Sequence, residues 1–266
     1  MVNERARFDT GEVELSYMEW PGNAPPVLFL HGGVSGLAVW RNLLELRGSL
    51  RAYAYDSRGC FHSGRASQYS FVDLARDAIA FLDGVVQAPA LLVGHSAGAM
   101  TSILVGAERP DLVRAMMLFD PPLFIHERCL GDFQPTFERM AKLSGLPVDE
   151  LIRNGVAEAV APSLSMADPG VFAGVVDGSY GEGLVMNEIL SRVKCPIVLT
   201  HGQQLREREG WANSMISADD VARAKALLPT ASFVEIPDSG HIPQTQNAPV
   251  ARELLSKFLA TTGSVS

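Results

Sequence analysis

The chain alternates short apolar runs with longer segments in which apolar residues recur at helical spacing. The short runs predict strands at residues 27–30, 52–55, 90–93, 115–119, 197–200 and 232–236. The longer segments predict helices at residues 40–50, 71–86, 97–108, 219–228 and 249–259. Strands that lack polar alternation are typically buried on both faces, as in parallel sheets whose strands alternate with helices. The pattern therefore predicts an α/β fold: a mostly parallel, doubly wound sheet with helices on both faces.

Two parts of the chain depart from this alternation of buried strands and helices. Residues 5–20 alternate polar and apolar side chains around the turn signal Asp9-Thr10-Gly11, which predicts a hairpin of edge strands. Residues 123–192 show helical and loop patterns without a strong strand. Because this segment lies between two predicted core strands, we expect a helical cap at 123–192 over a core formed by 1–122 and 193–266.

The cap segment is rich in aromatic residues, which allow two interpretations. These residues either shape an apolar pocket or pack the interior of the cap itself. They are Phe124, Phe133, Phe137, Phe172 and Tyr180.

Composition narrows the classes of partner. The 266 residues are 47% hydrophobic, enough for a sizeable core, and the formal net charge of -8 argues against a nucleic-acid or anionic-membrane partner.

The three cysteines, Cys60, Cys129 and Cys195, are widely spaced, so we expect neither a disulfide framework nor a metal site. No cofactor is expected. The N-terminus has no apolar signal core and no run is long enough for a membrane helix, so we expect a cytoplasmic protein and leave its oligomeric state open.

The segment Gly94-His95-Ser96-Ala97-Gly98 joins a predicted buried strand to a predicted helix. Ser96 stands at the apex of this sharp turn, whose strained backbone crowds the residues two positions away and so favours glycine there. The hydroxyl is directed above the N-terminus of the helix, where unpaired N–H groups can receive an oxyanion. A Gly-x-Ser-x-Gly pattern alone occurs often by chance, but a strand before it and a helix after it make it informative.

Two further motifs follow predicted strands and lie at the same edge of the sheet. His31-Gly32-Gly33 ends the strand at 27–30, and its glycines allow backbone N–H groups to turn inward, which makes Gly33 a candidate oxyanion donor. Ser239-Gly240-His241 follows the last strand. An imidazole titrates near neutrality and can accept the proton of a serine hydroxyl, so His241 is the candidate base.

The order of these three motifs resembles that of the α/β-hydrolase family, across nearly the whole chain. The resemblance implies that Ser96 is the nucleophile and His241 its general base. It also implies that the backbone N–H groups of Gly33 and Ala97 bind the oxyanion.

The acid of the triad departs from the usual family pattern, which would place it at Leu205. Leucine cannot hold an imidazolium, so we consider Asp120, at the end of the strand 115–119, and Glu207 or Glu209, in an Arg-Glu-Arg-Glu loop. A chain without a functional acid is the third alternative. We favour Asp120 because it lies on a rigid element one strand from Ser96, whereas the two glutamates alternate with arginines as in an exposed loop.

These residues predict a serine hydrolase that cleaves an ester, lactone or amide bond of a small, partly apolar molecule through an acyl-enzyme. The same fold and triad also allow a C–C bond hydrolase or a cofactor-free oxygenase. A non-catalytic ligand-binding protein is a further alternative, and the displaced acid is its only support. Arg206 and Arg208 either meet a substrate carboxylate or belong to a solvated loop.

Overall fold

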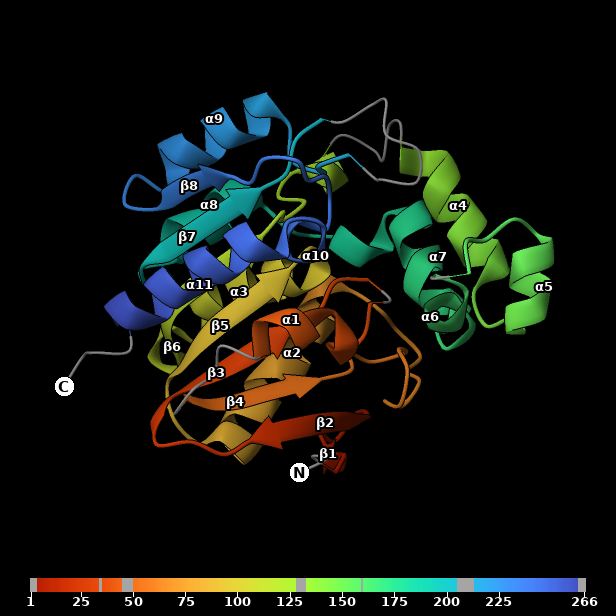
Figure 1. Cartoon of the computed structure of the whole chain (residues 1–266), viewed down its shortest axis with the longest axis horizontal. Helices are drawn as coiled ribbons and strands as arrows, with labels where there is room; N and C mark the ends of the chain where they lie inside the picture. Colours follow the sequence, from red (N-terminus) through yellow and green to blue (C-terminus); the bar gives the residue numbers. More distant parts are fainter. Residues whose placement is uncertain are drawn as a thin grey trace.

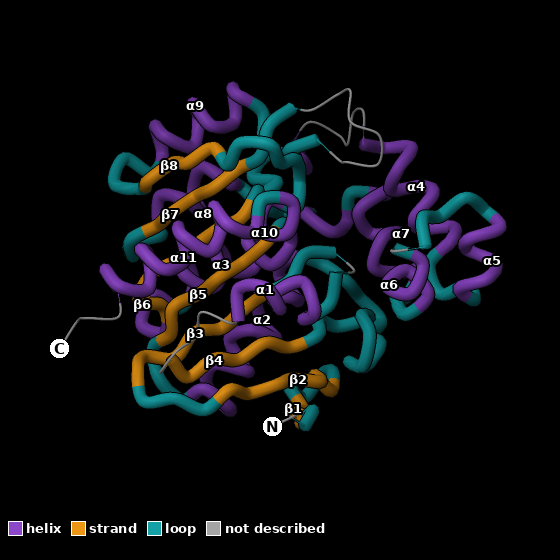
Figure 2. Tube along the Cα trace, viewed as in Figure 1, coloured by secondary structure: helices purple, strands orange, loops and turns teal. Residues whose placement is uncertain are grey.

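A computed structural model describes residues 4–33, 35–44, 50–127, 133–158, 160–204 and 213–262 of the chain. Eight strands form one sheet (Figures 1 and 2): β1 (Ala6–Asp9), β2 (Glu14–Trp20), β3 (Ala24–Leu30), β4 (Leu50–Tyr55), β5 (Ala90–His95), β6 (Val113–Phe119), β7 (Ile197–His201) and β8 (Ser232–Glu235). Their order is β1-β2-β4-β3-β5-β6-β7-β8. The pairs from β4 to β8 are parallel, and β1 and β2 are the antiparallel edge.

The helices lie between the strands in sequence. Those that accompany the sheet are η1 (Leu37–Trp40), α1 (Arg41–Leu44), α2 (Phe71–Phe81), η3 (Leu82–Val86), α3 (Ala97–Glu108), η4 (Pro110–Leu112), α8 (Met186–Arg192), α9 (Ala218–Leu227), α10 (Pro243–Gln246) and α11 (Ala248–Thr262). Those between β6 and α8 are η5 (Ile125–Glu127), α4 (Gln134–Leu143), α5 (Val148–Arg153), α6 (Ala161–Ser165), α7 (Pro169–Asp177) and η7 (Ser179–Gly181).

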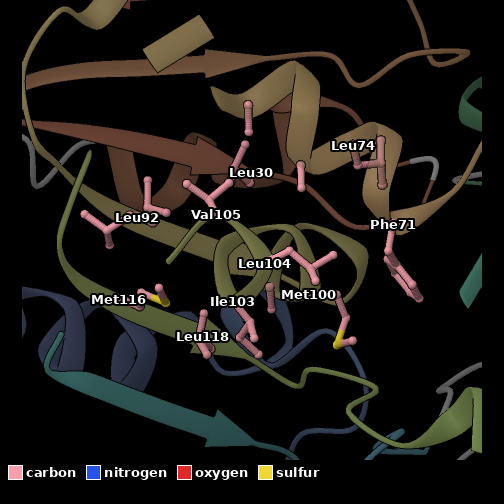
Figure 3. Packing of buried hydrophobic residues seen from close by; sticks show 14 of the residues in the cluster. Leu30, Phe71, Leu74, Leu92, Met100, Ile103, Leu104, Val105, Met116 and Leu118 are labelled. Atoms are coloured by element: carbon pink, nitrogen blue, oxygen red, sulfur yellow. The ribbon is translucent and has the colours of Figure 1, made fainter. Parts of the chain in front are cut away.

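The sheet is buried on both faces because successive residues of a strand point to opposite sides. In β5, Leu92 packs with α2, α3 and α8, whereas Leu91 and Val93 pack with α1 and α11. Figure 3 shows Ile103, Leu104 and Val105 of α3 among the strand residues of the first face. This arrangement confirms the predicted α/β fold with a mostly parallel sheet and helices on both faces.

Most predicted elements match, and the differences have local causes. The hairpin at 5–20 forms as β1 and β2. The helix predicted at 71–86 is α-helical only to Phe81, and the wider turn η3 continues it to Val86, where Gln87 ends it in a left-handed conformation. Of the helix predicted at 40–50, Trp40 ends η1 and Arg41–Leu44 form α1, whereas Leu50 already belongs to β4; residues 45–49 lie outside the described part.

The helices α4 to α7 form a group beyond the end of the sheet at which the parallel strands finish (Figure 1). They have a small core of their own, which includes Leu151, Leu164 and Phe172. In contrast, α8 packs on α3, and its Met186 and Leu190 belong to the main core. The division into a core and a cap at 123–192 stays a prediction. Within the described ranges, no helix is long and apolar enough to cross a bilayer.

Candidate active site

Ser96 lies between the end of β5 and the start of α3 with φ 50° and ψ -117°. A positive φ is costly for a residue with a side chain, so the surrounding structure has to hold it. The Ser96 N–H donates to the carbonyl of Phe119 on β6 at 3.0 Å, and the Ser96 carbonyl accepts from Ala99 and Met100 of α3. The serine is thereby fixed in the sharp turn that the sequence predicts.

The glycines on either side of Ser96 are required by close approach of the backbone. A Cβ atom on Gly98 would lie 2.0 Å from the carbonyl oxygen of Leu30, and one on Gly94 would lie 2.5 Å from that of Gly98. No side chain fits at these distances. The first turn of α3 therefore packs directly against the ends of β3 and β5.

His241 faces Ser96 from the loop that follows β8. Its Nε2 lies 3.0 Å from the Ser96 Oγ, and its Nδ1 lies 2.6 Å from Oδ2 of Asp120. Because a carboxylate only accepts, Nδ1 carries the proton and Nε2 is left as the acceptor for the serine hydroxyl. The structure thus brings together three residues that lie far apart in the sequence, two of them in motifs and the third at the end of a strand.

Asp120 follows β6, is fully buried and has φ 47°. Besides His241, its carboxylate accepts hydrogen bonds from Ser214 Oγ at 2.5 Å, from the Met215 N–H at 2.8 Å and from the Gly202 N–H at 3.3 Å. Four donors therefore meet one carboxylate, whose oxygens act only as acceptors. They also hold Asp120 in the orientation that reaches the imidazole.

Glu207 and Glu209 lie outside the described residues, as do Leu205, Arg206 and Arg208.

Sequence reasoning missed the residues that support Asp120. Ser214 and Met215 have no motif, and they reach the carboxylate from positions 94 and 95 residues further along the chain. Gly202 has a detectable signal, since a glycine directly after a core strand marks close approach of the backbone. A Cβ on Gly202 would lie 2.0 Å from the carbonyl oxygen of Gly240, next to His241. The end of β7 therefore packs against the loop that carries the histidine.

The two candidate oxyanion donors border the same space as Ser96. Ala97 is the first residue of α3, so its N–H has no carbonyl within the helix to pair with. Gly33 has φ 41° at the turn after β3, and both residues line the cavity above Ser96. In the described residues, no group of His, Cys, Asp or Glu is arranged to hold a metal ion.

The cavity above Ser96 has a volume of about 530 Å³ and is mainly apolar. None of its described lining residues is Asp, Glu, Lys or Arg. Its few polar side chains besides Ser96 and His241 include Ser35, Thr245 and Gln246. Such a space suits an uncharged ligand, because a charged group would lose its hydration without gaining a charged partner.

The aromatic residues singled out in the sequence divide between the two interpretations. Four of them line the cavity: Phe133, Phe137, Phe172 and Tyr180. Two of these four, Phe137 and Phe172, also pack within the α4–α7 core. Phe124 does not line the cavity and instead lies 3.9 Å beneath the guanidinium of Arg223.

His95 is a further residue whose contact the sequence did not reveal. Its Nε2 donates to the backbone carbonyl of His241 at 2.7 Å, and the two rings lie 4.9 Å apart. Burial, together with the neighbouring His241, holds the pKa of His95 well below its ordinary value. Burial also lowers the pKa of His31, which Asp56 opposes only in part.

These two lowered pKa values predict a loss of stability on mild acidification. Both rings take up protons less readily in the folded state than in the unfolded chain, where they do so below about pH 6.5. The unfolded state then binds more protons, so the free energy of unfolding falls as the pH falls, by up to about 1.4 kcal/mol per pH unit for each ring. Urea unfolding at pH 7.5, 6.5 and 5.5 measures this slope.

The His95→Gln variant is the matched comparison for that slope, because glutamine keeps a donor for the His241 carbonyl but does not titrate. We expect its stability to change less steeply with pH than that of the wild type. Equal slopes in the two proteins would contradict the contribution of His95.

Comparison with known proteins gives relatives along nearly the whole chain. The 2-(acetamidomethylene)succinate hydrolase of Mesorhizobium japonicum is 24% identical over 273 residues, covering 95% of this chain and 94% of the relative. A crystal structure of E-2-(acetamidomethylene)succinate hydrolase superposes with a TM-score of 0.78 at 22% identity, covering 97% of this chain and 99% of that one. The N-acyl homoserine lactonase AidH, solved as a point mutant with N-hexanoyl homoserine, gives a TM-score of 0.78 at 18% identity, covering 100% and 99%.

A family model provides the broader assignment. It describes the alpha/beta hydrolase family and matches residues 27–253, which include the turn at Ser96, the strand end at Asp120 and the loop at His241. The relatives of this chain include hydrolases such as that of Mesorhizobium japonicum, and the eight-stranded, mostly parallel sheet agrees with the fold. The chain therefore belongs to the alpha/beta hydrolase family.

Proposed function

We propose that this hydrolase cleaves an ester, lactone or amide bond of a small, neutral, partly apolar molecule through a covalent acyl-enzyme. The observation that carries the proposal is the chain of contacts from Ser96 Oγ to His241 Nε2, at 3.0 Å, and from His241 Nδ1 to Asp120 Oδ2, at 2.6 Å. A serine hydroxyl becomes a competent nucleophile when a positioned imidazole takes its proton.

The reaction begins with attack of the Ser96 oxygen on the substrate carbonyl carbon. His241 takes the hydroxyl proton at Nε2, and the negative charge of Asp120 stabilises the resulting imidazolium. The carbonyl oxygen, now an oxyanion, accepts hydrogen bonds from the N–H groups of Gly33 and Ala97. As the tetrahedral intermediate collapses, the bond to the leaving group breaks and His241 donates its proton to the leaving oxygen or nitrogen.

Water then hydrolyses the acyl-enzyme, with His241 again acting first as base and then as acid. His241 removes a proton from the water molecule while the water oxygen attacks the acyl carbon. The ester bond to Ser96 then breaks, the serine oxygen recovers a proton from His241 and the carboxylic acid is released. No metal or cofactor takes part in these steps.

The cavity argues for a neutral substrate. Its wall toward α4 and α7 consists mainly of apolar and aromatic side chains, such as Phe137, Phe172 and Val175. The lactonase with a similar fold was solved with a hexanoyl ligand, which is consistent with a lactone or ester that carries an apolar acyl group. The name of the Mesorhizobium relative indicates a succinate as its substrate, for which the described lining of this cavity offers no positively charged side chain.

Two esters with the same leaving group test this proposal. We expect kcat/KM for p-nitrophenyl hexanoate to exceed that for the p-nitrophenyl monoester of succinate by on the order of 10², because the succinyl carboxylate would be buried without a partner. Ser96→Ala measures the background rate for both. An equal or reversed preference would contradict the neutral substrate and point to Arg206 or Arg208. Wild-type rates no higher than background for every ester, lactone and amide tested would contradict the hydrolytic function.

A further inference from the structure

The backbone on either side of His241 is held by a single side-chain oxygen. The N–H groups of Gly240 and Ile242 both donate to Oε1 of Gln246, at 2.8 Å and 3.2 Å. The carbonyl of His241 accepts from His95 Nε2 at 2.7 Å. The peptide groups that flank the imidazole are therefore fixed by two side chains, neither of which acts on the reacting atoms in the proposed chemistry.

Gln246 reaches these groups because the chain turns back on itself directly after His241. The short helix α10 begins at Pro243 and ends at Gln246, whose own N–H donates to the carbonyl of Ile242 at 3.0 Å. Backbone N–H groups can only donate, so the amide oxygen of Gln246 has to face them. The orientation of this carboxamide follows from its partners.

The position of His241 depends on such contacts because its loop lies between β8 and α10, outside the hydrogen-bond ladder of the sheet. The loop also contains Asp238 at φ 51°. The imidazole has to satisfy two partners at once, Ser96 and Asp120, at 3.0 Å and 2.6 Å. A misplacement of about 1 Å in such an arrangement can lower a rate by about 10².

We propose that Gln246 is a positioning residue for the general base: it sets the backbone at residues 240–242 so that the His241 ring meets both Ser96 and Asp120. This inference rests on the proposed function, because it takes His241 as the base. Gln246 acts through the loop and not on the reacting atoms. The contact with Gly240 distinguishes this role from simple capping of α10, because Gly240 lies outside that helix.

The variants Gln246→Met and Gln246→Glu separate positioning from packing. Methionine has a similar length but lacks the acceptor, so we expect kcat to fall about 10- to 100-fold while KM changes less than about threefold. Glutamate restores the acceptor, so we expect most of kcat to return at the optimal pH. The introduced carboxylate also favours the imidazolium. The acidic limb of the pH profile of kcat/KM should therefore move to higher pH by about half a unit or more.

Gln203→Met provides the matched control, because Gln203 follows β7 and its side chain contacts the same loop. The Gln203 side chain accepts from the N–H of Asp238 at 3.2 Å and donates to Glu235, three residues or more before His241. We expect its kcat to stay within about threefold of the wild type, with an unchanged pH profile.

The outcomes distinguish this inference from the proposed function. Equal losses in Gln246→Met and Gln203→Met would overturn the inference, as would wild-type kcat in Gln246→Met. Should Gln246→Met fail to fold, Gln246→Glu decides: a low kcat with an unmoved acidic limb would overturn the positioning role. The proposed function fails separately, if Ser96→Ala keeps the wild-type rate.

Discussion

Asp120→Asn is expected to lower kcat by on the order of 10⁴ while the protein still folds. The amide lacks the negative charge that stabilises the imidazolium of His241. Its NH₂ group can also donate to Nδ1, which selects the tautomer that presents an N–H to Ser96 and so leaves no acceptor for the serine proton. Steady-state kinetics with p-nitrophenyl hexanoate measure the loss, and thermal unfolding shows whether the variant is folded.

The two glutamates of the Arg-Glu-Arg-Glu loop provide the controls for Asp120. We expect Glu207→Gln and Glu209→Gln to keep kcat within a few fold, since Asp120 already occupies the Nδ1 side of His241 at 2.6 Å. The opposite ranking, with a large loss in either glutamate variant and a small one in Asp120→Asn, would reassign the acid. Three unaffected variants would favour a triad without a functional acid.

Ser96→Ala is expected to remove turnover, with a loss in kcat of more than about 10⁴. Without the hydroxyl no acyl-enzyme can form, and only the weak acceleration from binding and the oxyanion donors remains. The fold should persist, because the Ser96 side chain makes no capping hydrogen bond to α3 and its backbone contacts with Phe119, Ala99 and Met100 do not involve the side chain. Turnover at the wild-type rate would remove the mechanism.

Ser102→Ala is the matched control on the same helix. Its hydroxyl donates to the Gly98 carbonyl at 2.8 Å, away from His241. Removing it should cost about 1 kcal/mol of stability and leave kcat within a few fold of the wild type. A comparable loss of kcat in both serine variants would indicate damage to α3 instead of loss of the nucleophile.

The sequence predicts the parts of this molecule that depend on local chemistry. Continuous apolar runs predict β3, β5, β6 and β7, because only strands buried on both faces need such runs. The turn at Ser96 is likewise recognisable, since its glycines are required by atoms a few residues away and by one neighbouring strand. Local patterns do not contain the strand order, in which β4 lies between β2 and β3.

The supports of the site could not be predicted because they depend on contacts between distant segments. Ser214 and Met215 meet Asp120 only once β6, β7 and the segment before α9 are packed together. His95 can be recognised as a neighbour of Ser96, but its bond to the His241 carbonyl spans 146 residues. Gln246 had a partial signal, since Pro243 marks a helix start close enough to His241 for a side chain to reach back.

The most direct test of the account is the covalent capture of the nucleophile by a fluorophosphonate. We predict that the Ser96 oxygen displaces fluoride and forms one P–O bond, so that intact-mass spectrometry shows a single adduct and peptide mapping places it on Ser96. Asp120→Asn should react far more slowly, and Ser96→Ala should not react. Absence of an adduct from the folded wild-type protein, or an adduct on a residue other than Ser96, would contradict the account.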